Sequence, residues 1–232
     1  MATGKPRARR SSNPAGPRLE KSPEGDVTSP LGKKTVWFLS GNVNKFREAK
    51  SVLAPFGIRV RHLDRAKVEV QDTRLENIAR FALKEALGAG RKPILVEDSG
   101  LFIEALGGFP GPYSSFVYAT IGLKGILDLL RKEQHRQAYF QSTIAFRSPS
   151  VEPRVFTGRV SGRIARRALG TSGFGYDPIF IPSGSEKTFG QTELSFKNVN
   201  SHRARAFRRF ARWFATSSSN TVRKSDGKRA LK

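Results

Sequence analysis

Residues 94–113 read ILVEDSGLFIEALGGFPGPY, and this stretch decides the fold class. The apolar run at 94–96 is typical of a strand that is buried on both faces of an α/β sheet. Glu97 and Asp98 follow it and are predicted at a strand end, where open α/β sheets bind their ligands. Two adjacent carboxylates repel each other, and a divalent cation is the simplest way to keep both ionised near a core. The alternative interpretation is an acidic turn on the surface.

The composition places the folded part of the chain between two basic ends. Residues 1–34 and 216–232 contain little that could form a core, whereas residues 35–215 have ordinary globular patterning. We therefore expect a disordered basic arm, one domain of two lobes and a disordered basic tail. An organellar transit peptide is the alternative for the arm, but its prolines and glycines disfavour an amphipathic helix.

The formal net charge of +23 is partly a property of these ends. Residues 1–34 contain eight basic and three acidic side chains. Residues 203–232 contain ten basic side chains and one acidic side chain. The intervening part is moderately basic, with 24 basic and 15 acidic side chains. Such a field suits polyanionic ligands, either nucleotides or nucleic acid.

The chain contains no cysteine, which excludes disulfides, thiolate metal sites and a cysteine nucleophile. No apolar run approaches the roughly 20 residues that a membrane span needs, and the amino-terminal residues lack the apolar core of a secretory signal. We expect a cytoplasmic protein that has no membrane contact.

The periodicity of apolar residues predicts an α/β fold. Strands are expected at residues 35–39, 59–63, 138–146 and 154–164. Helices are expected at residues 44–54, 75–86, 123–130 and 201–214. The strands at 138–146 and 154–164 are interpreted as a smaller β lobe. On the last helix, Phe207 and Phe210 are expected to face the core. Its arginines at 205, 208, 209 and 212 are expected to face outward.

Ser40, Asn42 and Lys45 lie in the turn between the first strand and the first helix. Amides at a helix N-terminus, a hydroxyl and a lysine suit a triphosphate, although the spacing is not that of a Walker A loop. Serine and asparagine are equally ordinary helix caps. Both interpretations stay open on the sequence alone.

Glu69 together with Glu97 and Asp98 could collect one or two Mg²⁺ ions, because magnesium prefers oxygen ligands and phosphate partners. A spare carboxylate could orient or deprotonate a water molecule. For Glu69, a solvated surface position is the alternative.

Two further groups of residues could bind a nucleotide. Phe174, Tyr176 and Asp177 could stack a base and accept hydrogen bonds from its edge, or form a core aromatic pair beside an Asp-Pro turn. Lys197 and Arg203 could hold phosphate. Of the three histidines in the chain, only His202 lies among other residues that could bind a ligand.

The order of the motifs SGNxxK, VEDSGL, ALGGFPGPY, GFGYDPIF, KN and SHR resembles the Ham1-like inosine triphosphate pyrophosphatase family, over about residues 35–214. The resemblance implies a two-lobed α/β fold with a long mixed sheet, a central substrate cleft and a homodimer. It implies Mg²⁺-assisted hydrolysis of ITP, dITP and XTP to the monophosphate and pyrophosphate, which cleanses the nucleotide pool of deaminated purines.

The resemblance also assigns roles to individual residues. Asp98 would activate water with support from Glu97, and Glu69 and Asp98 would hold the metal. The triphosphate would contact Ser40, Asn42 and Lys45, and the base pocket would consist of Phe174, Tyr176, Asp177, Lys197, His202 and Arg203. In many family members a lysine stands where this chain has Phe81.

Two alternative functions remain. Related folds act on modified pyrimidine nucleotides, so the substrate could be another modified nucleotide. A nucleic-acid-binding protein without catalysis is a different class, which the basic helix face and the basic ends motivate. The acidic residues and Lys45 argue against lost catalysis.

Overall fold

The computed structural model describes residues 34–63, 70–86, 92–149 and 151–226, with side chains as far as residue 216. Residues 1–33 of the predicted arm and Glu69 lie outside these ranges. The described residues all belong to one compact unit. No helix in the described part is long and apolar enough to cross a membrane.

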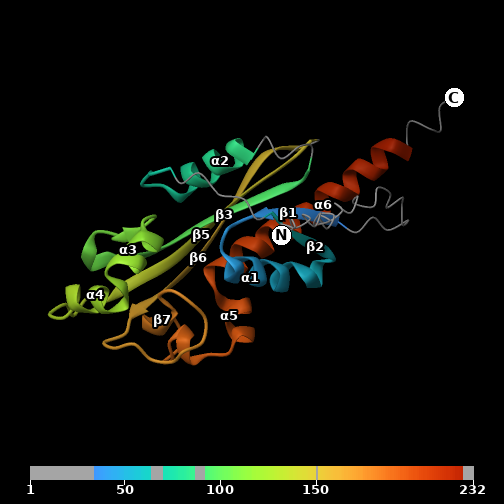
Figure 1. Cartoon of the computed structure of the whole chain (residues 1–232). Helices are drawn as coiled ribbons and strands as arrows, with labels where there is room; N and C mark the ends of the chain where they lie inside the picture. Colours follow the sequence, from blue (N-terminus) through green and yellow to red (C-terminus); the bar gives the residue numbers. More distant parts are fainter. Residues whose placement is uncertain (1–33, 64–69, 87–91, 150, 227–232) are drawn as a thin grey trace, which may run out of the picture. The chain divides into compact units, whose positions relative to one another are not determined.

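A seven-stranded mixed sheet runs through this unit, in the order β2-β1-β3-β5-β6-β7, with β4 pairing β3 (Figure 1). β1 pairs in parallel with β2 and β3, and the other pairings are antiparallel. The strands are β1 Lys34–Leu39, β2 Ile58–Leu63, β3 Ile94–Ile103, β4 Pro110–Gly111, β5 Gln137–Ser148, β6 Val151–Ile164 and β7 Phe180–Pro182. The predicted α/β class with a long mixed sheet is confirmed.

The helices flank this sheet on both faces. They are α1 Val43–Leu53, α2 Leu75–Glu85, α3 Ser114–Thr120, α4 Gly122–Leu129, α5 Leu194–Asn200 and α6 His202–Asp226. α3 and α5 were not predicted, because each is short and carries no clear apolar stripe. α6 continues to Asp226, so the predicted end near Phe214 was wrong. The sequence beyond Phe214 is rich in serine and threonine, which are weak helix formers.

The acidic pair lies in the middle of β3. The sequence analysis expected the pair at the end of the strand, and that expectation was wrong. β3 stays paired with β5 as far as Ile103, because β5 offers a backbone partner along the whole strand. The last parallel pair between β1 and β3 joins Leu39 to Val96. Glu97 and Asp98 therefore lie just beyond the carboxyl end of β1, beside the turn that leads into α1.

The strands β5 and β6 do not form a separate β lobe. β5 pairs with β3 from Ile103 back to Ile94, so the long β5–β6 hairpin continues the same sheet. β3, β5 and β6 consequently belong to one continuous sheet.

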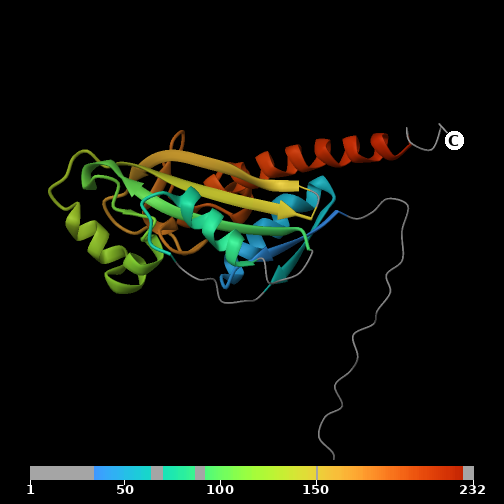
Figure 2. The same cartoon turned by 90° about the horizontal axis from the view of Figure 1, so that it is seen from above.

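Three apolar clusters cover the sheet. One packs α1 and α6 against one face and includes Phe38, Phe146 and Phe207. A second packs α2 against the opposite face and includes Leu83. The third fills the lobe of α3, α4 and β7 around Phe180. Figure 2 shows α6 lying lengthwise along the sheet, and the buried Phe207 and Phe210 confirm its predicted core face.

The close packing of α6 on β6 depends on Gly158. A Cβ atom at this position would lie 2.1 Å from the His202 carbonyl oxygen and 2.4 Å from the Ala206 nitrogen. Both are backbone atoms, so neither can rotate away. Glycine at 158 therefore brings the start of α6, which carries His202 and Arg203, close to the sheet.

We predict that Gly158→Ala lowers the free energy of unfolding by about 1–3 kcal/mol, the usual range for overpacking. The measurement is urea unfolding followed by circular dichroism. Gly41→Ala is the matched control, since nothing lies within 4 Å of a Cβ at Gly41. Equal stability of the two variants would contradict this packing argument.

Candidate active site

A cleft with a volume of about 1280 Å³ opens over the middle of β3. Its walls come from the β1–α1 turn, β3, residues 109–118, residues 174–177 and the junction of α5 and α6. The sequence-predicted residues that line it are Ser40, Asn42, Lys45, Glu97, Asp98, Phe174, Tyr176, Asp177, Lys197, His202 and Arg203. Folding thus brings together eleven side chains from distant parts of the chain, and the twelfth, Glu69, lies outside the described residues.

The β1–α1 turn combines a helix cap with the cleft wall. Asn42 is the N-cap of α1, and its Oδ1 accepts from the backbone N–H groups of Asn44 at 3.0 Å and Lys45 at 3.1 Å. Ser40 is fixed from two sides, because its Oγ accepts from the Asn42 N–H and its carbonyl oxygen lies 2.6 Å from His62 Nε2. The capping interpretation holds, and it places the positive end of the α1 dipole beside the cleft.

The two carboxylates of the acidic pair lie on opposite faces of the sheet, because successive side chains of a strand alternate. Leu95, on the Glu97 side, belongs to the cluster of α1 and α6, and Val96, on the Asp98 side, to that of α2. The expectation that one divalent cation neutralises both carboxylates is therefore wrong. The sequence argument failed because it placed the pair at a strand end, whereas the strand continues to Ile103.

Glu97 is neutralised by protein cations. Its Oε2 lies 2.9 Å from Lys45 Nζ, and its Oε1 accepts from Arg203 Nε at 3.0 Å and from Ser142 Oγ at 2.7 Å. Burial by itself would raise the pKa of Glu97, but Arg203 and Lys45 hold this pKa far below its usual range. Glu97 is thus ionised and fixes two of the predicted ligand-binding cations.

Glu48 on α1 is a buried member of the site that the sequence analysis missed. Its Oε1 lies 2.7 Å from Lys197 Nζ, and its Oε2 accepts from Arg203 Nη1. Burial opposes ionisation, yet Arg203 and Lys197 lower the pKa of Glu48. A signal was present in the sequence, since Glu48 falls beside Ala49 on the core-facing stripe of α1, where a charged residue is unusual.

These contacts form one alternating series of charges, here called the ion chain. Lys197 Nζ also lies 2.6 Å from Asp177 Oδ2, which extends the series to the loop before β7. Its members, in order of contact, are Asp177, Lys197, Glu48, Arg203, Glu97 and Lys45. Three carboxylates balance three cations, so the ion chain is neutral.

The loop at residues 174–177 forms one end of the cleft. The sequence analysis predicted that residues of this loop bind a base. The Phe174 ring centroid lies 4.3 Å from Lys197 Nζ and 5.4 Å from Arg203 Cζ, so two cations lie over this ring. Asp177 accepts from the Phe174 N–H at 2.7 Å, and burial raises the pKa of Asp177 against the influence of Lys197. Tyr176 belongs to the core, because its hydroxyl donates to the Ser114 carbonyl oxygen at 2.9 Å.

His202 lines the cleft and is almost fully buried. The imidazole is 4% exposed and stacks on Phe140, with 4.7 Å between ring centroids. Within the described residues its Nδ1 has no hydrogen-bond partner. Burial, reinforced by the charge of Arg203, lowers the pKa of His202 well below its usual value, so the ring is neutral. A neutral imidazole offers one donor and one acceptor.

The carboxylates suitable for a hard cation lie on the Asp98 side of the cleft. Asp98 is partly exposed and lines the cleft, as does Asp72, which the sequence analysis did not select. Asp72 accepts from the Arg74 N–H at 2.7 Å and from Asn77 Nδ2 at 2.9 Å at the start of α2. In the described part of the chain no three ligand-type residues form a metal cluster. The donor chemistry of Asp98 fits Mg²⁺.

The chain is similar to proteins of known family over most of its length. Residues 36–213 match the model of the Ham1 family. The dITP/XTP pyrophosphatase of Methanopyrus kandleri is 48% identical over 179 residues, which cover 77% of this chain and 95% of that protein. The dITP/XTP pyrophosphatase of Hyperthermus butylicus is 49% identical over 181 residues, covering 78% and 94%.

Solved structures agree with these sequence matches. The Ham1 protein of Staphylococcus aureus superposes with a TM-score of 0.69 at 30% identity, covering 79% of this chain and 100% of that one. A HAM1 protein of Coxiella burnetii gives a TM-score of 0.70 at 27% identity, covering 79% and 99%.

We predict that Glu48→Gln lowers the free energy of unfolding by roughly 3–5 kcal/mol, because it leaves Lys197 and Arg203 without a shared buried counter-ion. Urea unfolding measures this. Glu76→Gln is the control, since Glu76 pairs with Arg80 at 3.0 Å on the exposed side of α2 and should change stability by only about 0.5 kcal/mol. Similar losses of unfolding free energy in both variants would show that the ion chain contributes no more to stability than an exposed ion pair.

Proposed function

Because this chain belongs to the Ham1 family, we propose that it hydrolyses ITP, dITP and XTP to the nucleoside monophosphate and pyrophosphate. The observation that carries the proposal is the convergence of eleven predicted residues on one cleft. The relatives at 48% and 49% identity are dITP/XTP pyrophosphatases and support the same reaction. The protein is accordingly an enzyme, a nucleoside triphosphate pyrophosphatase.

The triphosphate would lie at the start of α1. Lys45 lines the cleft there, and its Nζ is held by Glu97 at 2.9 Å. The positive end of the helix dipole favours phosphate at the same place. Ser40 and the free amide group of the Asn42 side chain complete the proposed contacts, while Asn42 Oδ1 keeps its capping role.

Asp98 would hold Mg²⁺ together with Glu69 and would orient and deprotonate the attacking water. When bound, the metal would neutralise phosphate charge, the main requirement of phosphoryl transfer. The water oxygen forms a bond to the α-phosphorus, the bond from that phosphorus to the bridging oxygen breaks, and pyrophosphate leaves. Glu97 supports this chemistry indirectly, since its charge is already balanced by Lys45 and Arg203.

The purine would lie at the Phe174 end of the cleft. Lys197, Arg203 and the neutral His202 are the proposed donors to the 6-oxo group, and Phe174 offers a ring face for stacking. An adenine amino group would leave buried donors unpaired, which costs about 1–3 kcal/mol for each group. Tyr176 and Asp177 would shape this pocket, Tyr176 from the core and Asp177 by holding Lys197 at 2.6 Å.

A homodimer and a cytoplasmic location remain proposals. The resemblance implies the dimer, and the cysteine-free composition is compatible with a reducing compartment. Large apolar side chains that a dimer contact could cover are exposed on and beside α3 and α4, namely Phe116, Tyr118, Ile121 and Leu129.

We expect ITP, dITP and XTP to give a kcat/KM at least about tenfold higher than ATP, because one unpaired buried donor costs about a factor of ten in rate. Pyrophosphate release is measured with Mg²⁺ and each of ITP, dITP, XTP, GTP and ATP. Modified pyrimidine triphosphates belong in the same series. Equal rates with ITP, XTP and ATP would overturn the substrate assignment, and a preference for a pyrimidine would favour the alternative substrate class.

We predict that Asp98→Asn lowers kcat by about 10²–10⁴ or more, the usual contribution of a general base. Pyrophosphate release from ITP is the assay, and circular dichroism checks the fold. Asp128→Asn is a matched control, because Asp128 is an exposed partner of Lys124 and Arg131 on α4. Near-normal turnover of Asp98→Asn would remove Asp98 from the centre of the mechanism.

A further inference from the structure

One face of α6 carries four arginines that have no role in the cleft. Arg205, Arg208, Arg209 and Arg212 are here called the arginine strip, and all but the half-buried Arg208 are exposed. At 100° per residue the four positions fall within an arc of about 100°. The opposite side of α6 is buried through Phe207, Phe210 and Ala211.

Three of the four arginines of the strip are held by hydrogen bonds to backbone carbonyl groups. Arg205 donates from Nη1 to the Arg159 carbonyl oxygen at 3.0 Å, and Arg209 donates to the carbonyl oxygen of Thr157, both on β6. Arg208 donates to carbonyl oxygens at the end of α5. These bonds orient the guanidinium groups but leave their charges unbalanced and most of their donors available.

Among the described residues, no carboxylate pairs with the positive charges of the strip. Residues 202–216 contain no Asp or Glu, and within the described residues none of the four arginines forms an ion pair. Partial burial, together with the charges of Arg205 and Arg212, lowers the pKa of Arg208, as expected where like charges crowd. A polyanion lying on this face would relieve the repulsion.

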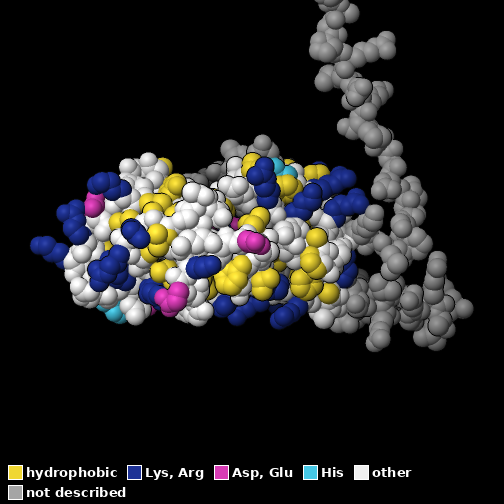
Figure 3. Space-filling view, turned by 90° about the horizontal axis from the view of Figure 1, so that it is seen from below, with side chains coloured by type: hydrophobic (Ala, Val, Ile, Leu, Met, Phe, Trp, Pro, Cys, Tyr) yellow, Lys and Arg dark blue, Asp and Glu magenta, His cyan; other side chains and the backbone are white. Residues whose placement is uncertain are grey.

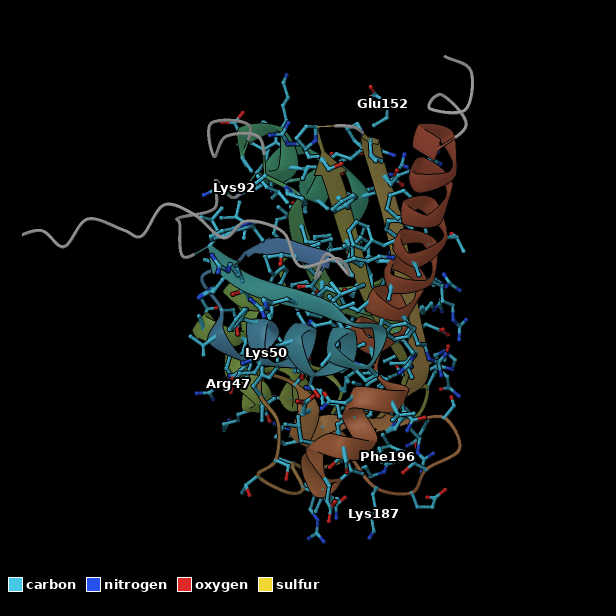
Figure 4. The ribbon with its side chains drawn as sticks, turned by 90° about the vertical axis from the view of Figure 1, so that its right-hand side faces the viewer. Arg47, Lys50, Lys92, Glu152, Lys187 and Phe196 are labelled. Carbon is cyan, nitrogen blue, oxygen red and sulfur yellow. The ribbon has the colours of Figure 1, made fainter. Side chains whose placement is uncertain are left out.

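We propose that the arginine strip binds the sugar–phosphate backbone of nucleic acid without reading its sequence. From Arg205 to Arg212 the strip is about 10 Å long at 1.5 Å per residue. One nucleic-acid strand presents about three phosphates over this length. Figure 4 shows nitrogen-tipped side chains projecting outward beside α6.

The same observations favour nucleic acid over an anionic membrane. A helix that lies on a membrane inserts an exposed apolar face, whereas the apolar face of α6 is buried against the sheet. Over the described part of α6 the outward arc contains arginines and no exposed aromatic residue for base stacking. The contact is therefore with phosphates. Figure 3 shows Lys and Arg side chains spread over the face of the molecule seen from below, so the test needs a control at a second basic place.

The test is fluorescence anisotropy of a labelled 20-base-pair DNA duplex of mixed sequence with the full chain, between 25 and 300 mM NaCl. Each phosphate contact contributes about 0.9 to the slope of log K against log salt. We expect the slope of Arg209→Gln/Arg212→Gln to be smaller by about 2. Arg212→Gln alone should lose about 1, and within the described residues it removes no side-chain hydrogen bond or ion pair, so it serves even if the double variant unfolds.

The matched control is Lys132→Gln/Arg167→Gln, which removes the same charge from two exposed residues near the far end of β6. Its slope should equal that of the unmodified protein, and all variants should keep pyrophosphatase activity. No DNA binding, an unchanged slope in the strip variants or an equal loss in the control would overturn the proposal. Strip-dependent binding to phosphatidylserine vesicles without strip-dependent DNA binding would overturn it in favour of a membrane.

Discussion

The ion chain is the interaction on which the cleft depends. It joins the loop before β7, α5, α1, α6 and β3, which are distant in sequence, through alternating charges that are almost all buried. Burying each of these charges alone would cost several kcal/mol, so each needs its neighbours. Every interior member contacts two opposite charges. The arrangement therefore selects one relative position of these elements and makes other packings unfavourable.

This constraint also prepares the cleft for its proposed reaction. Lys45 at the proposed phosphate end and Lys197 at the proposed base end are held by carboxylates before any substrate arrives. Donors that are already oriented need little reorganisation in the transition state. The ion chain lies on one face of β3, whereas Asp98 lies on the other. The side of the cleft with balanced charge is thus the proposed nucleotide side, and the side of Asp98 is the proposed place of metal and water.

α6 connects this interior with the surface. Its first residues supply His202 and Arg203 to the cleft, and Gly158 permits the close approach to β6 that brings them there. The following turns bury phenylalanines against the sheet and present the arginine strip outward. One helix therefore carries two kinds of arginine. Arg203 is buried and paired with two carboxylates, whereas Arg212 is exposed and forms no ion pair with any described residue.

The sequence by itself determined what local patterns encode. Apolar periodicity indicated β1, β2, β5, β6, α1, α2 and α4 with approximate ends, and the ordered motifs identified eleven of the residues that line the cleft. Tertiary structure alone decided the rest. It placed Glu97 and Asp98 on opposite faces of β3, joined β5 to β3 in one sheet, and made Glu48 a counter-ion for Lys197. These outcomes depend on which strand or cation packs against a residue, and local periodicity does not specify contacts between segments so far apart in the chain.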